Sequence, residues 1–76
     1  MTQYGVVLFH TTSAALRAEK LVKQAGLACK LIPVPRELSS NCGISLRFSW
    51  EQAEAVQALL REAGVDVADA QPLNGP

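Results

Sequence analysis

The clearest structural signal in the chain is GISLRFSWEQAEAVQALLREAGV, residues 43–65. Residues 44–48 alternate apolar and polar side chains, as a strand with one covered face does. Ser49 followed by Gln52 has the spacing of a capping box, which opens a helix. Apolar side chains then recur at helical spacing, and Gly64 stands where a helix would end. These apolar positions are Ala53, Val56, Leu59, Leu60 and Ala63. The stretch therefore predicts a strand followed by an amphipathic helix.

The same pattern occurs earlier in the chain at a constant offset of 38 residues. Gly5 aligns with Gly43 and Gly26 with Gly64, and most apolar positions between them coincide. Residues 11–13 offer good N-cap side chains for the first helix. The chain therefore reads as two copies of one strand–helix–strand unit.

The four predicted strands cover residues 4–10, 29–34, 44–48 and 65–70, and two helices alternate with them. Two right-handed units with interleaved inner strands give a ferredoxin-like α+β sandwich, β-α-β-β-α-β, with helices on one face of an antiparallel sheet in strand order 4-1-3-2. Pro33 suggests that the second strand lies at an edge. We expect residues 1–70 to form a single domain and residues 71–76 a flexible tail.

The repeat also predicts which side chains face the helices. Ile44, Leu46 and Phe48 form the covered face of their strand, and the equivalent positions are Val6, Leu8 and His10. The side chains then expected on the open face are Val7, Phe9, Ser45 and Arg47. Apolar side chains there favour homodimerisation or partner binding through the sheet, although simple exposure is the alternative.

Composition excludes several classes of function. Seven basic and seven acidic residues give zero net charge, which argues against nucleic-acid binding. We expect neither a membrane span nor a secretory signal, and therefore a cytoplasmic protein. The single histidine and the two cysteines, 13 residues apart, show no metal-ligand or redox spacing, and no glycine-rich phosphate loop is present. We expect no cofactor and no metal.

Cys42 is the one candidate for chemistry. In the predicted topology the start of the third strand lies beside the end of the first, near His10, Thr11 and Thr12. A helix N-terminus there would stabilise a thiolate, and Arg36 could add positive charge.

Several neighbours could support this thiol. Gly43 would let a second chain approach the backbone closely. Ser39, Ser40 and Asn41 either make local turns or form a polar cradle for an anion near the sulfur. The alternative is that Cys42 is an inert residue in a turn. Cys29 is expected to pack in the core.

The segment LIPVPRELSSNCG, residues 31–43, with Leu46-Arg47-Phe48 behind it, resembles the selenium/sulfur (Se/S) carrier protein-like family of small bacterial proteins. The likeness extends over about residues 4–67 and includes Phe9-His10-Thr11-Thr12. The resemblance implies a carrier, not an enzyme. Cys42 would hold a persulfide or perselenide and pass it between donor and acceptor proteins. The alternative function is a small non-catalytic ligand- or protein-binding module that dimerises through its open sheet face.

Overall fold

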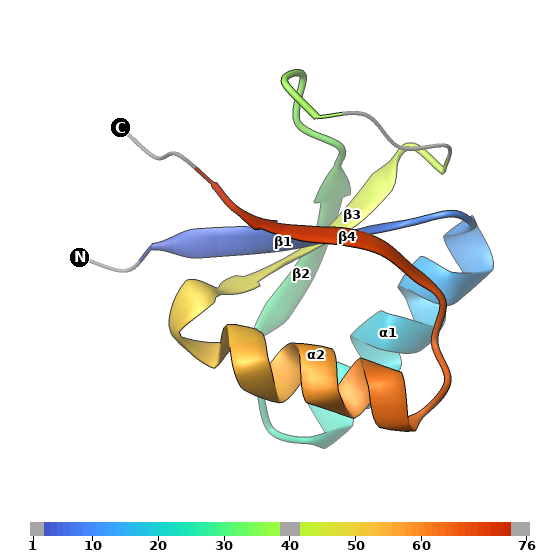
Figure 1. Cartoon of the computed structure of the whole chain (residues 1–76), viewed down its shortest axis with the longest axis vertical. Coiled ribbons are helices and arrows are strands. Elements are labelled where there is room, and N and C mark those ends of the chain that lie inside the picture. The colour runs from blue at the N-terminus through green and yellow to red at the C-terminus, as the bar shows by residue number, and fades with distance from the viewer. Residues whose placement is uncertain (1–2, 39–41, 74–76) are drawn as a thin grey trace.

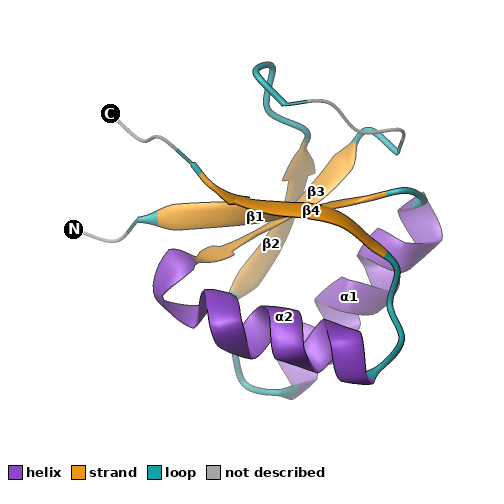
Figure 2. Cartoon of the chain, in the orientation of Figure 1, coloured by secondary structure: helices purple, strands orange, loops and turns teal. Residues whose placement is uncertain are grey.

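The computed structural model describes residues 3–38 and 42–73 and contains one sheet and two α-helices (Figure 1). The sheet is antiparallel, in the order β2-β3-β1-β4, and both helices cover the same side of it (Figure 2). In chain order the elements are β1 (Tyr4–Phe9), α1 (Thr12–Gln24), β2 (Cys29–Pro33), β3 (Ile44–Ser49), the 3-10 turn η1 (Trp50–Gln52), α2 (Ala53–Glu62) and β4 (Val67–Pro72). This confirms the ferredoxin-like α+β architecture, the predicted strand order and the edge position of the strand that contains Pro33.

The helix ends follow the local signals with one exception. The Thr11 hydroxyl accepts a hydrogen bond from the Ala14 amide at 3.1 Å, as an N-cap should. Gly26 and Gly64 have positive φ angles of 83° and 73°, the conformation in which glycine ends a helix. The predicted capping box at Ser49 is wrong, because Ser49 makes no side-chain cap bond.

The chain enters the second helix through a 3-10 turn and not through a capping box. The Trp50 amide donates to the Gln3 carbonyl oxygen at 2.8 Å, which extends the contact between the first and third strands past the end of β3. The chain then enters α2 through the 3-10 turn Trp50–Gln52. This 3-10 turn therefore stands between β3 and α2, where the capping box was predicted.

The fourth strand lies two residues later than predicted. Val65 instead lies just after α2, where its amide donates to the Leu60 carbonyl oxygen at 3.0 Å and so caps the helix end. Pro72 pairs with Gly5, and the Leu73 amide donates to the Tyr4 carbonyl oxygen at 2.8 Å. Gln71 and Pro72, predicted as part of a flexible tail, are therefore in the sheet.

The register between β1 and β3 overturns the predicted faces of the first strand. Val7 lies opposite Leu46, and directly opposite residues in an antiparallel pair point to the same face. Val7 and Phe9 are fully buried and belong to the core under the helices. The prediction that they lie on the open face, available to a partner, is wrong. Val6 and Leu8 occupy that face instead.

A difference of one residue between the two units explains the error. In the first unit the last core residue of the strand, Phe9, stands two positions before the N-cap Thr11. In the second, Phe48 directly precedes Ser49, the N-cap of the 3-10 turn. A shift of one residue moves every side chain of a strand to the other face. His10, expected to face the helices, is exposed beyond the end of β1.

The central apolar side chains of the open face are buried, whereas Tyr4 is exposed and Ile32 is partly exposed on it. Val6 and Leu8 are only 0% and 3% exposed, although no helix covers this side. Val6 lies between Arg47 of β3 and Gln71 of β4, and both of these side chains are long and polar. The prediction of sheet-to-sheet homodimerisation was based on exposed Val7 and Phe9 side chains, and both of these are buried.

Residue 5, near the start of β1, must be a glycine because an aromatic ring lies against its backbone. A Cβ atom at this position would overlap the ring of Trp50 and would lie 3.0 Å from the Gln71 carbonyl oxygen. The Trp50 ring in turn lies beside Phe48, with 5.8 Å between the ring centroids. The tryptophan therefore closes this end of the core only if residue 5 has no side chain.

We predict that Gly5→Ala lowers the free energy of unfolding by about 1–3 kcal/mol, the usual cost of overpacking. Urea denaturation followed by circular dichroism would measure it. In a Trp50→Ala background the same change should cost much less, because the ring it would meet is gone. An equal cost in both backgrounds would contradict this account of Gly5.

Candidate functional site

Cys42 lies at the base of the β2–β3 connection, two residues before Ile44 begins β3. Pro33 pairs with Ile44, and the Val34 amide donates to the Gly43 carbonyl oxygen at 3.2 Å. These contacts hold the two ends of the β2–β3 connection next to each other. Cys42 therefore lies at the edge of the sheet where β2 ends and β3 begins. Ser39, Ser40 and Asn41, the predicted polar cradle, lie outside the described residues.

Gly43 stands between Cys42 and the first residue of β3. Its φ angle is 74°, a left-handed conformation that side-chain-bearing residues rarely adopt. Apart from its chain neighbours Cys42 and Ile44, no described residue has an atom within 4 Å of the position that a Cβ atom would take there. Among the described residues, glycine is thus required by the backbone turn and not by crowding.

The Cys42 thiol is partly buried and bonded. It packs at the margin of the hydrophobic core, and its sulfur donates to the Ile44 carbonyl oxygen at 2.9 Å. A thiolate has no proton to donate, so ionisation of Cys42 requires this bond to be given up. The Cys42 sulfur therefore lies at the edge of the core, in contact with the backbone where β3 begins.

The predicted neighbourhood of Cys42 is present in part. Leu8 pairs with Ser45, which confirms that the start of β3 lies beside the end of β1. However, two amides near the start of α1 already have acceptors, because the Thr11 hydroxyl and carbonyl oxygens accept from the Ala14 and Ala15 amides. These two amides are therefore not available to an anionic sulfur.

The other predicted neighbours are exposed. His10, Thr12 and Arg36 all lie at the surface, Arg36 in the turn that follows β2. Their proximity to the Cys42 sulfur stays a prediction.

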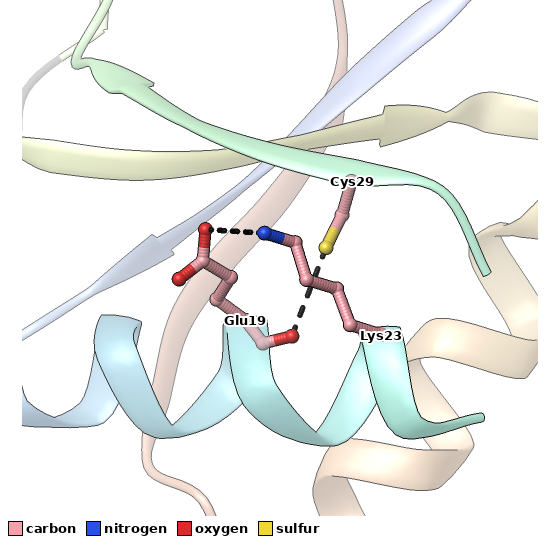
Figure 3. A network of polar contacts seen from close by, with 3 residues as sticks. All are labelled: Glu19, Lys23 and Cys29. Atoms are coloured by element: carbon pink, nitrogen blue, oxygen red, sulfur yellow. Dashed lines mark hydrogen bonds and ion pairs between the residues drawn. The ribbon is translucent and has the colours of Figure 1, made fainter. Parts of the chain in front are cut away.

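Cys29 packs between β2 and α1, as predicted, beside Glu19 and Lys23 (Figure 3). It is partly buried against the core, and its sulfur donates to the Glu19 carbonyl oxygen at 3.8 Å. Burial raises the pKa of the Cys29 thiol; the nearby Lys23 ammonium lowers this pKa and the Glu19 carboxylate raises it further. Lys23 and Glu19 also form an ion pair, with 3.2 Å between nitrogen and oxygen.

The two cysteines are far apart. Cys29 lies opposite Phe48, and Cys42 lies beyond Ile44 at the other end of β3. The four residue steps from Phe48 to Ile44 alone span about 13 Å at the usual rise of a strand. A disulfide within one chain is excluded by this distance, and both thiols are free.

The remaining features point to no other reactive centre. Within residues 3–38 and 42–73, no group of three or more His, Cys, Asp or Glu side chains is arranged to hold a metal ion, and no helix has the length and apolar character to cross a membrane. A shallow pocket of about 380 Å³ lies between α2 and β4 and contains neither cysteine. Its lining residues are Val7, Gln57, Leu60, Arg61, Val65 and Val67.

Fold and site together define a small ferredoxin-like protein with one thiol at the start of an inner strand and a second thiol packed under a helix. The family model described as "Putative Se/S carrier protein-like" matches residues 4–70, and the chain belongs to this family. It is also 28% identical over 50 residues to the uncharacterized protein YtiA of Escherichia coli (strain K12). That match covers 66% of this chain and 59% of YtiA, so the chain spans less than two thirds of that relative. No solved structure matches.

We predict that Cys29 is alkylated more slowly than the same residue in the unfolded chain. The measurement is the rate of reaction with iodoacetamide against pH, in a Cys42→Ser variant with and without urea. Because the pKa of Cys29 is raised in the fold, the folded curve should rise at higher pH than the unfolded curve.

The same shift has a consequence for stability. Just above the ordinary thiol pKa the folded chain keeps a proton that the unfolded chain loses. The contribution of Cys29 to stability is therefore intact at lower pH and declines as the pH rises through this window. Superimposable alkylation curves, or a folded curve that rises at lower pH, would contradict the role of burial at Cys29.

Proposed function

We propose that this protein carries sulfur or selenium on Cys42 and passes it from a donor protein to an acceptor protein. The observation that supports this proposal is the contrast between the two thiols. Both thiols are partly buried, but Cys42 lies at the end of the sheet next to Gly43, which has no side chain, whereas Cys29 is packed against α1 with a raised pKa. Membership in a family described as Se/S carrier protein-like supports the same assignment.

The transfer step is an exchange between a thiolate and a persulfide. The Cys42 thiolate attacks the outer sulfur of a cysteine persulfide on the donor, and a new S–S bond forms as the donor's S–S bond breaks. The donor leaves as a thiolate, and Cys42 holds the transferred sulfur as a persulfide. An acceptor thiolate then attacks that outer sulfur in the same way. No net oxidation occurs, and a perselenide follows the same scheme.

Several residues of this chain would take part in the step. Cys42 first releases its hydrogen bond to the Ile44 carbonyl oxygen, because the attacking form has no proton. Gly43 presents no side chain of its own to an approaching donor. Arg36, His10 and the Thr11–Thr12 segment would flank the charged sulfur.

We propose further that the protein acts as a carrier and not as an enzyme, because each transfer consumes one donor and one acceptor. A reducing compartment such as the cytoplasm suits this function, since Cys42 must be a free thiol before loading. The alternative function, a module that dimerises through its open face, has lost its structural basis because Val7 and Phe9 are core residues.

The prediction is that the chain gains the mass of one sulfur atom when it is incubated with glutathione persulfide. Intact-mass spectrometry under non-reducing conditions would measure the adduct. Cys29→Ser should load as the wild-type chain does, and Cys42→Ser should not load. The two variants are matched controls, because each retains one cysteine in a folded chain that circular dichroism can verify.

Two results would contradict carriage on Cys42. One is a wild-type chain that gains no sulfur at a donor excess that loads a free cysteine peptide. The other is a Cys42→Ser chain that gains sulfur as fully as the wild type, which would assign the adduct to Cys29.

A further inference from the structure

Two basic side chains face each other on the open side of the sheet. Lys30 of β2 lies directly opposite Arg47 of β3, in the register that also places Arg47 opposite Val6. Like charges at directly opposite positions destabilise a sheet. The Arg47 guanidinium carbon lies 4.5 Å from the centroid of the Tyr4 ring, a cation–π contact that keeps this charge on the sheet surface. We call Tyr4, Lys30 and Arg47 the basic row.

No carboxylate neutralises the basic row in the described part of the chain. The ion pair found there joins Lys23 to Glu19, and both residues belong to α1, on the other side of the sheet. The acidic side chain that the register puts on the open face is Asp69, in the neighbouring row of β4 opposite Leu8. Its oxygens accept from the Ala70 amide at 2.8 Å and from the Gln71 side-chain amide at 2.6 Å.

We infer that the basic row is the docking surface for a carboxylate-rich segment of a partner protein. Cross-strand neighbours are about 5 Å apart, so adjacent carboxylates of such a segment could contact Lys30 and Arg47 together. The protein carries zero net charge, so the attraction would come from this row and not from the molecule as a whole. An unfavourable charge pair that remains on a surface is explained if a partner supplies the opposite charge.

The chemistry of the face favours an acidic protein segment over a nucleic acid. Single strands bind sheets by stacking their bases on aromatic rings. Tyr4 is the aromatic residue among the described residues of this face, and Arg47 already lies over its ring. Arg47 lies three residue steps inside β3, about 10 Å from Ile44, and none of these observations involves Cys42, so the inference stands whether or not Cys42 carries sulfur.

The test uses a fluorescein-labelled octaglutamate peptide, with fluorescence anisotropy at low ionic strength as the readout. The wild-type chain should bind it, and added salt should weaken the binding. Lys30→Gln/Arg47→Gln should weaken it about tenfold. The matched control is Lys20→Gln/Arg61→Gln, which removes the same charge from exposed positions on the helices. This control should bind within about twofold of the wild type.

A single variant separates docking from a structural role. Lys30→Glu places opposite charges across β2 and β3, so the midpoint of thermal unfolding should rise while octaglutamate binding is lost. If Lys30 serves only to protect the sheet edge, Lys30→Glu will bind the peptide as the wild type does, and the inference fails. It also fails if the two double variants bind equally, if the wild type does not bind, or if an oligothymidylate of the same length binds more tightly.

Discussion

The register between β1 and β3, in which Val7 lies opposite Leu46, determines both faces of this molecule. It buries Val7 and Phe9 under the two helices and points Val6 to the outer face. It also places the start of β3 beside the end of β1, which fixes where the backbone carries Cys42. The two proposed surfaces, one at the thiol and one at the basic row, both follow from this pairing.

Much of the fold could be predicted because its signals are local. The Thr11 cap and the glycines at positions 26 and 64 mark the helix ends through backbone chemistry that acts within a few residues. Pro33 indicates an edge strand, because it cannot donate a ladder hydrogen bond. The repeat of one unit then restricted the topology to an interleaved sheet, and the strand order confirms it.

The faces of β1 could not be predicted in the same way. Residues 5–9 are glycine followed by four apolar side chains, so no alternation marks the inner face. The repeat transferred the faces of β3, but the strand-to-helix connections differ by one residue, which inverts the assignment. The hydrogen bond from Cys42 to Ile44 and the opposition of Lys30 and Arg47 likewise depend on tertiary geometry and register, which composition and spacing do not encode.

The register itself is open to direct measurement by nuclear Overhauser effects on a methyl-labelled chain. The account predicts contacts from the Val7 methyl groups to Ala18 and Val22 of α1 or to Leu60 of α2, and none from Val6 or Leu8 to these helices. Contacts from the Val6 and Leu8 methyl groups to α1 and α2, with Val7 among the outer-face side chains, would contradict it.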